Sequence, residues 1–327
     1  MSYNLTNKKV LLIGAGYMAR EYIKVLKSMG CDIIVVGNSE NNAKKFQEET
    51  GITVYAGGID NYLKNNDIDS DIYAINAVRT IFLAQVNLTL LKNGCKHLLS
   101  EKPGITTKKE GKELLKSAEK SDVYIAYNRR FYASVFAAET IIKEDGGVTS
   151  FTVEFTEWRH LLEQLEKEKK DFLNKLFLCN SSHVMDMAFY LSGGKIEKLY
   201  SIVKGENDID WHKSGSVFGG VGTTDLGQIF TYSANWDAPG RWGIELNTKK
   251  HRLIFRPLEK LQIQDKGSVK IYEADVDYTI DEKYKPGLYK EVESFLTDNK
   301  DSRLCTLRQQ VNNITNYAKI SGESLLK

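Results

Sequence analysis

The feature that most constrains how this chain can fold is a glycine-rich turn near its start. An apolar run over 10–13 leads directly into Gly14-Ala15-Gly16-Tyr17-Met18-Ala19, and an amphipathic stretch follows to about residue 29. In a turn of this G-x-G-x-x-A spacing, the first glycine allows a tight bend and the second lets a pyrophosphate approach the backbone. The small last residue lets the helix pack closely on the strand, and free N–H groups at the helix start bind the phosphates. The sequence therefore predicts a dinucleotide site formed by Gly14, Gly16, Tyr17, Met18 and Ala19.

The first 130 residues repeat this alternation of strand and helix. Helical patterns separate six short apolar runs, which lie at 10–13, 33–36, 52–55, 72–77, 98–99 and 123–127. Strands joined in this way are typical of a doubly wound parallel sheet, because a right-handed crossover places a helix on the face of the sheet. We therefore predict an α/β protein whose residues 1–130 form a dinucleotide-binding domain.

From residue 131 the pattern changes to a second α/β domain, which we expect to span 131–327. A strand with one buried face is predicted over 149–158, and the glycine-punctuated, β-branched and aromatic stretch over 196–278 is typical of an antiparallel sheet. Helices are expected at 132–143, 161–173, 181–191, 288–296 and 306–321. The last two could pack back on the first domain.

Composition excludes several classes of protein. The 45 basic and 43 acidic residues leave a net charge of +2, which gives no field suited to nucleic acid or an anionic membrane. No apolar run approaches the roughly 20 residues of a membrane-spanning helix, and no signal-peptide pattern is seen. Four cysteines without a C-x-x-C pair and five dispersed histidines favour neither disulfides nor a metal site. We expect a cytoplasmic protein.

The second strand bears on the choice of cofactor. An acidic residue at its end would accept a hydrogen bond from the ribose 2′-hydroxyl of NAD, but this chain has Val36-Gly37-Asn38-Ser39 there. Asn38 and Ser39 can donate hydrogen bonds to a 2′-phosphate, which favours NADP. NAD remains the alternative, because Glu40 would restore an acid if the strand ended two residues later.

The fifth apolar run ends in Glu101-Lys102-Pro103-Gly104. Its charged residues would lie at the carboxyl edge of the sheet, where open α/β sheets bind their ligands. By itself, Glu101-Lys102-Pro103 favours a solvated charge pair before a loop proline over an active site.

Four segments taken together resemble the Gfo/Idh/MocA oxidoreductases, the family of glucose-fructose oxidoreductase and inositol dehydrogenase. They are the G-x-G-x-x-A turn with Glu101-Lys102-Pro103, and the segments 126–131, 182–186 and 236–242. The resemblance implies an N-terminal Rossmann domain and a C-terminal α/β domain with an open, mostly antiparallel sheet. It also implies a homo-oligomer, dimer or tetramer, and a sugar, cyclitol or nucleotide-linked sugar as the small-molecule substrate.

The resemblance also assigns chemistry to residues. Lys102 corresponds to the active-site lysine, and the bond between this lysine and proline is often cis in the family. Hydride transfer needs a proton carrier, which similar members provide with a D-x-x-x-H pair. His183 matches the histidine, but Cys179 occupies the place of the aspartate. Either another group orients His183, or Lys102 and Tyr127 carry the proton.

The remaining site expectations fall into two groups. We expect further contacts to the cofactor from Asn38, Ser39, Asn76, Glu101 and Lys102, and to the substrate from Lys102, Asn128, Arg129, Asn180, His183, Arg159 and Trp236. For Arg130 a surface position is equally open, and Asp186 is as apt to make a structural pair as to bind substrate. The predicted activity is an NAD(P)-dependent dehydrogenase or reductase acting on CH–OH groups. The alternatives are a non-catalytic cofactor sensor and an enzyme of a non-sugar substrate.

Overall fold

The structure is a computed structural model that describes residues 5–165, 172–297 and 301–326. Spatial proximity divides the described chain into two compact units. The first unit contains the residues up to 127 together with 283–312, and the second contains 128–282 and 313–326.

The first unit is built on a seven-stranded sheet, sheet A, with the order β15-β6-β5-β4-β1-β2-β3. The first six strands along the chain pair in parallel, and the short β15 pairs antiparallel to β6. The strands are β1 (Lys9–Ile13), β2 (Asp32–Val36), β3 (Val54–Tyr55), β4 (Tyr73–Asn76), β5 (His97–Glu101), β6 (Asp122–Ala126) and β15 (Cys305–Thr306). The six predicted strands and the doubly wound sheet are confirmed.

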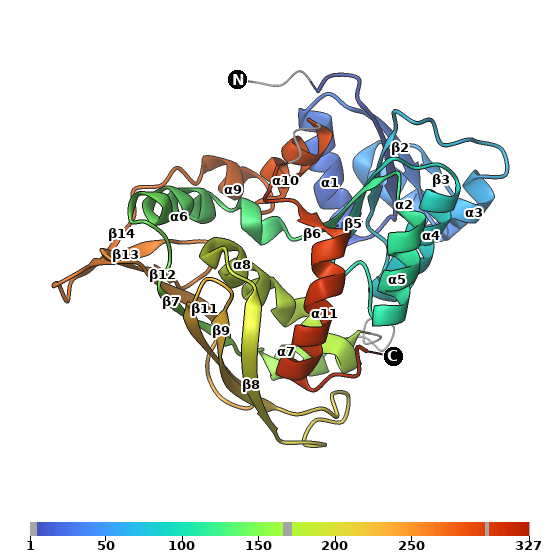
Figure 1. Ribbon diagram of the computed structural model, residues 1–327. Coiled ribbons are helices and arrows are strands. Elements are labelled where there is room, and N and C mark those ends of the chain that lie inside the picture. Colours follow the sequence, from blue (N-terminus) through green and yellow to red (C-terminus); the bar gives the residue numbers. More distant parts are fainter. Residues whose placement is uncertain (1–4, 166–171, 298–300, 327) are drawn as a thin grey trace. The chain divides into compact units, whose positions relative to one another are not determined.

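Helices cover both faces of sheet A, with α4 and α5 on one side and α1 and α10 on the other (Figure 1). This arrangement buries the apolar side chains of the central strand, as expected for a parallel sheet. In α1 the buried residues Tyr22, Ile23 and Leu26 form one face toward the core. The helices are α1 (Tyr17–Ser28), α2 (Glu40–Thr50), α3 (Gly58–Tyr62), η1 (Thr80–Phe82), α4 (Leu83–Lys92), α5 (Lys108–Ser117), α10 (Leu288–Leu296) and the first part of α11 (Leu307–Ser321).

The second unit is built on an eight-stranded sheet, sheet B, with the order β14-β13-β12-β11-β7-β10-β9-β8. Only the β7–β10 pair is parallel, so the prediction of a mostly antiparallel sheet is confirmed. The strands are β7 (Ser150–Phe155), β8 (Ile196–Lys204), β9 (Val217–Thr224), β10 (Ile229–Asn235), β11 (Trp242–Asn247), β12 (His251–Phe255), β13 (Gln262–Asp265) and β14 (Ile271–Glu273).

Helix α8 packs on β7 and β11 of sheet B (Figure 1). The alternation in β7 explains the contact, because Phe151, Val153 and Phe155 are buried between exposed or half-buried neighbours. The helical segments are η2 (Asn128–Phe131), α6 (Ala133–Glu144), α7 (Arg159–Glu163), η4 (Leu173–Lys175), the π-helical turn η5 (Phe177–Ser181), α8 (Ser182–Ser192) and α9 (Thr279–Lys283).

The single helix predicted over 161–173 is wrong in its extent. Helix α7 ends at Glu163, and the 3₁₀ turn η4 begins at Leu173. Residues 166–171 of that prediction lie outside the described part of the chain. Helices in proteins owe most of their stability to packing of an apolar face, so the charge-rich sequence after Glu163 disfavours a longer helix.

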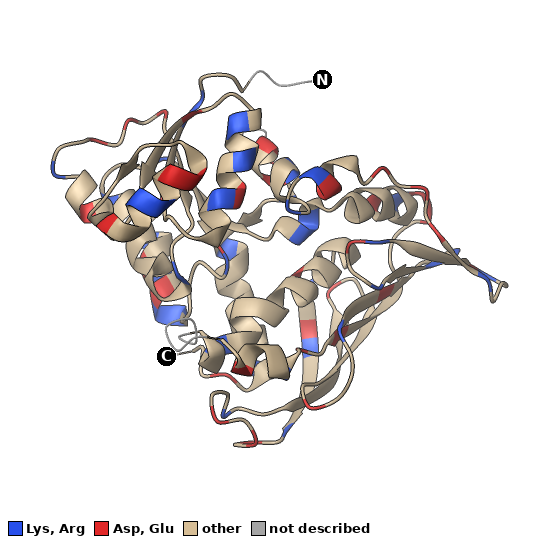
Figure 2. Ribbon diagram, turned by 180° about the vertical axis from the view of Figure 1, so that it is seen from behind, with Lys and Arg blue, Asp and Glu red and all other residues tan. Residues whose placement is uncertain are grey.

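Basic and acidic residues are interspersed along the helices (Figure 2). Within the described ranges, no helix combines the length and the apolar character needed to cross a membrane.

Candidate active site

The glycine-rich turn joins β1 to α1 in the first unit. Gly14 has φ +121°, and a Cβ there would lie 2.5 Å from the carbonyl oxygen of Ala77, so only glycine fits. At Gly16 the opposite holds, because an added Cβ would meet no atom within 4 Å. Gly16 is the N-cap of α1, and no side chain caps the helix start. Open space above free N–H groups fits a pyrophosphate, so these residues suit a dinucleotide.

The loop after β2 contains the residues expected at the ribose end. Strand β2 ends at Val36, and Glu40 is the first residue of α2, so Glu40 is not at the strand end. The Ser39 hydroxyl oxygen accepts from the N–H of Asn42 as the N-cap, which leaves its hydrogen available for donation. The carbonyl of Asn38 accepts from the N–H of Gly57. No carboxylate therefore lies between β2 and the start of α2.

Strand β5 ends at Glu101, and the following Lys102–Pro103 peptide bond is cis, as the resemblance implies. The Tyr22 hydroxyl of α1 donates to the Glu101 carboxylate at 2.9 Å. Burial raises the pKa of Glu101, and the nearby charge of Lys102 opposes that rise. Burial, with the Glu101 charge, also raises the pKa of Tyr22 well above its usual value. Glu101 therefore ties the end of β5 to the helix that follows the glycine-rich turn.

Two buried amides hold the same turn from other sides. Gln310 of α11 donates to the Pro103 carbonyl at 3.0 Å and accepts from the Tyr127 hydroxyl at 3.1 Å. Asn87 of α4 donates to the Ser100 hydroxyl and to the Gly104 carbonyl. Side chains of three helices thus hold the residues on both sides of Lys102, and two of their contacts are to the backbone carbonyls of Pro103 and Gly104.

Two of the sequence expectations concern residues of this network. Tyr127 is 1% exposed and its hydroxyl supports the Pro103 turn through Gln310, which favours a positioning role over proton transfer. Asn76 is fully buried, and its amide donates to the Leu83 carbonyl and to Asn87. Asn76 therefore belongs to the network that holds the turn, and its contact with a cofactor stays a prediction.

In the second unit, a π-helical turn leads into α8. The N–H groups of Phe177 and Leu178 donate to the buried Glu323 carboxylate at 2.7 and 3.3 Å. His212 lies 3.0 Å from the same carboxylate. Burial raises the pKa of Glu323, and the His212 contact opposes it. Single π turns of this kind occur frequently at functional sites.

A buried acid, Glu157, lies beside this turn. Its carboxylate accepts from the Asn180 amide at 3.1 Å, from the Ser181 hydroxyl at 2.6 Å and from the Arg241 guanidinium at 3.3 Å. Burial raises its pKa, while the Ser181 bond and the Arg241 charge act in the other direction. Asn180 is therefore fixed by Glu157, a residue that follows the end of β7.

Around Trp242, which begins β11, aromatic and cationic side chains gather. The guanidinium carbons of Arg129 and Arg241 lie 4.7 and 4.6 Å from the Trp242 ring centroid. The His183 ring centroid lies 6.4 Å from that of Trp242, and Trp158 packs on Arg241 at 4.7 Å. The structure thus brings together Arg129, Asn180 and His183 of the predicted substrate residues.

The remaining expected substrate residues of this unit make other contacts. Arg130 is not a surface cation, because it is 4% exposed and forms a bidentate pair with Asp186. Arg159 pairs with Glu163 and Asp237 on the surface. Trp236 is 2% exposed and its ring packs on His212 at 4.7 Å, which favours a core position, and its contact with substrate stays a prediction.

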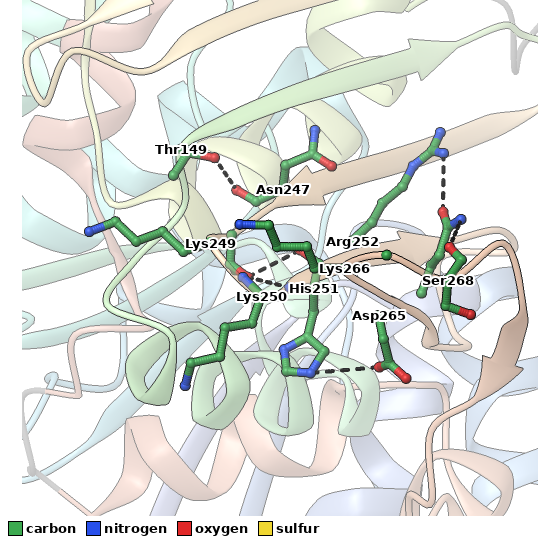
Figure 3. Close-up of a pocket in the computed structure, with 12 residues that line it drawn as sticks. Thr149, Asn247, Lys249, Lys250, His251, Arg252, Asp265, Lys266 and Ser268 are labelled. Carbon is green, nitrogen blue, oxygen red and sulfur yellow. Dashed lines mark hydrogen bonds and ion pairs between the residues drawn. The ribbon is translucent and has the colours of Figure 1, made fainter.

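A hollow of about 600 Å³ lies elsewhere on the second unit, at the turns between β11 and β12 and after β13. Figure 3 shows its mostly basic and polar lining, with His251 toward Asp265. None of the predicted site residues lines it. In the described part of the chain, no group of three or more His, Cys, Asp or Glu residues is arranged to hold a metal ion.

A family model matches the N-terminal part of the chain. The sequence model described as "Oxidoreductase family, NAD-binding Rossmann fold" matches residues 8–129. Residues 8–129 therefore belong to the Gfo/Idh/MocA oxidoreductase family. No curated protein sequence matches the chain.

Solved structures resemble the chain over nearly its whole length. A UDP-N-acetylglucosamine 3-dehydrogenase from Acidithiobacillus ferrooxidans is 15% identical, with a TM-score of 0.75 and coverage of 98% of this chain and 99% of that chain. A levoglucosan dehydrogenase in complex with NADH and levoglucosan is also 15% identical, with a TM-score of 0.75 and coverage of 98% and 97%. A putative NADPH-dependent oxidoreductase from Desulfitobacterium hafniense is 17% identical, with a TM-score of 0.75 and coverage of 98% and 94%. At these identities the likeness shows a shared fold.

Three residues that hold the candidate site were missed in the sequence. Asn87 and Gln310 are uncharged polar residues inside helices, and nothing in the sequence marks them as ligands of a distant turn. Glu157 left a signal, because it is an acid directly after a half-buried strand. Position 179 is a cysteine, yet a buried carboxylate still lies beside the π-helical turn.

Proposed function

We propose that this chain transfers a hydride between a nicotinamide cofactor and a carbinol or keto carbon of a sugar, cyclitol or nucleotide-linked sugar. The observation that carries this proposal is the Lys102 turn. It lies at the carboxyl end of β5 in the sheet that also carries the glycine-rich turn. Tyr22 donates to the Glu101 side chain, and Gln310 and Asn87 donate to the backbone carbonyls of Pro103 and Gly104. Fixed backbone at the ligand-binding edge of a parallel sheet is typical of a catalytic position.

The cofactor would be held by the start of α1 and by the loop after β2. The N–H groups after Gly16 suit the pyrophosphate, and Asn38 and Ser39 suit the ribose end. We propose NADP as the preferred cofactor, with NAD as the alternative. The support is the lack of a carboxylate between Val36 and Glu40 together with the N-terminus of α2, which favours an added phosphate.

The proton chemistry falls to side chains of this chain. The nicotinamide, when bound, accepts or returns the hydride. In the oxidation, Lys102 takes the hydroxyl proton at Nζ and releases it to solvent, and in the reduction it gives a proton to the new hydroxyl oxygen. We assign His183 as a second proton carrier, because it matches the family histidine and is 4% exposed beside Trp242.

We further propose that the chain assembles as a dimer or tetramer. The support is the set of large apolar side chains left exposed on β8, β9 and β10, namely Tyr200, Ile202, Val221 and Ile229.

The test replaces Lys102 with Met and uses the exposed Lys109→Met on α5 as the matched control. Nicotinamide absorbance is followed with NADP and NAD against a panel of sugars, cyclitols and their keto forms, and cofactor binding is measured by calorimetry. Removing the proton carrier should lower kcat by about 10²- to 10⁴-fold while cofactor affinity stays within about twofold.

An unimpaired rate in Lys102→Met would remove Lys102 from the mechanism. If the wild-type protein binds cofactor tightly but turns over no substrate of the panel, the chain is a cofactor sensor. Turnover of non-sugar alcohols alone would replace the substrate class and keep the enzyme.

A further inference from the structure

The arginines around Trp242 are arranged in a way that sugar hydroxyls alone do not require. Arg241 lies between two indoles, 4.7 Å from the centroid of Trp158 and 4.6 Å from that of Trp242. Arg129 lies 4.7 Å from the centroid of the same Trp242 ring. When a guanidinium stacks on aromatic rings, the rings cover its flat faces and fix its plane. Its N–H groups then point outward within that plane, where they can donate hydrogen bonds.

Only part of this donor capacity is used within the unit. Arg241 donates from Nη1 to Glu157 at 3.3 Å, and its side chain is still 43% exposed. The Arg129 Nε is buried, and it has no hydrogen-bond partner among the residues that the structure describes. No ion pair of Arg129 with a described acidic residue is formed either. A buried donor without a partner costs free energy unless a ligand supplies the acceptor.

The charge of the cluster is also unbalanced. Arg129 and Arg241 provide two positive charges around Trp242, and among the described residues Glu157 is the one carboxylate hydrogen-bonded to either of them. Guanidinium groups donate and never accept, so they match a group that offers several acceptor oxygens and a negative charge. A neutral hydroxyl offers neither the charge nor the bidentate geometry.

We propose that Arg129 and Arg241, held by Trp242, form a subsite for an anionic substituent of the substrate, a carboxylate or a phosphate ester on the sugar. This proposal rests on the proposed function and narrows it from sugars in general to sugar acids and phosphorylated sugars, the latter including nucleotide-linked sugars. Glu157 and Trp158 are positioning residues in this subsite, because they hold Arg241 and need not touch the substituent.

The test measures binding, so that it does not depend on turnover. Calorimetry measures the affinity for glucose, galactose and mannose and for the uronate and 6-phosphate of each sugar. Every titration is made once with saturating NADP and once with saturating NAD. The variants are Arg129→Gln, Arg129→Lys and Arg241→Lys, with Arg252→Gln as the control, because Arg252 is a paired arginine of β12 far along sheet B. Thermal melting of each variant checks that it is folded.

We expect at least one anionic sugar to bind about tenfold or more tightly than its neutral parent, as for a charge-assisted bidentate contact. Arg129→Gln should abolish that preference. The lysine variants should retain part of the preference for anionic sugars, because lysine keeps the positive charge but lacks the parallel N–H groups of a guanidinium. Arg252→Gln should leave it unchanged.

Two results would overturn the subsite. One is equal or weaker binding of every anionic sugar relative to its neutral parent, and the other is a preference that persists in Arg129→Gln and Arg241→Lys alike. If the uronates gain and the phosphates do not, the substituent is a carboxylate, and the reverse pattern identifies a phosphate. Turnover of a neutral sugar without any anion preference overturns the subsite alone, whereas an anion preference without any turnover overturns the hydride-transfer proposal alone.

Discussion

The two glycines of the phosphate turn should respond oppositely to the same added methyl group. In Gly14→Ala the Cβ would lie 2.5 Å from the Ala77 oxygen and 2.8 Å from the Ala77 carbonyl carbon, at φ +121°. The positive φ costs about 1–2 kcal/mol and the overlap with backbone about 1–3 kcal/mol more. We expect Gly14→Ala to lower the unfolding free energy by about 2–5 kcal/mol, which lowers the melting temperature by roughly 4–20 °C for a domain of this size.

Gly16→Ala should leave the fold intact and remove the cofactor. Gly16 has φ −97° and ψ −165°, a conformation open to alanine, and a Cβ there meets nothing within 4 Å. Its stability should be unchanged, or higher by about 0.4–1 kcal/mol, because alanine restricts the unfolded chain. The methyl group would occupy the space that a pyrophosphate needs, so we expect a loss of cofactor affinity of at least about tenfold, equivalent to one charge-assisted hydrogen bond.

Both variants are examined by thermal melting with and without NADP and NAD, and by calorimetric titration. The wild-type protein should melt higher with cofactor, because a ligand that binds only the native state stabilises it. Gly16→Ala should melt like the wild type alone and lose this shift. If Gly16→Ala binds cofactor with wild-type affinity, the phosphates do not approach this backbone. If Gly14→Ala melts as the wild type does, the clash with Ala77 is not real.

Two further predictions concern buried charges of the second unit. Asp186→Asn should lower the free energy of unfolding in urea by about 3–5 kcal/mol, because it leaves the Arg130 guanidinium buried without its carboxylate. The double variant Arg130→Met with Asp186→Leu should recover most of that loss. Equal stability of the single and double variants would contradict this coupling. Burial raises the pKa of Glu157 above its usual 4.5, so the folded state holds that proton more tightly than the unfolded state. Its contribution to stability is therefore fully present below about pH 4.5 and is lost as the pH rises through the raised pKa. The urea unfolding midpoint is measured at several pH values across this range for the wild type and for Glu157→Gln. The midpoint of Glu157→Gln should fall less with rising pH than that of the wild type. If the two midpoints change with pH in parallel, Glu157 does not titrate in this range.

Sheet A could be predicted in detail because its signals are local. The six parallel strands coincide with short apolar runs, and the crossover helices between them follow the chain in order. Gly16, Asn38 and Lys102 follow the ends of β1, β2 and β5, as the order of the runs predicted, and their roles as ligand contacts stay predictions. The two-residue strand β15 was not predicted, because it owes its form to pairing with β6 and carries no periodicity of its own.

The contacts that hold the site could not be predicted, because they join positions far apart in the chain. Gln310 is 207 residues from Pro103, and Arg241 is 84 residues from Glu157. The D-x-x-x-H pattern before His183 shows only that Cys179 stands where similar proteins have an aspartate. The structure shows that β7 places a different acid, Glu157, against Asn180 and Ser181 of the same turn. The sequence position of an acid is therefore a weak guide to whether a carboxylate lies beside the turn before α8. A carboxylate can reach that turn either from the helix itself, at position 179, or from the end of β7, at Glu157.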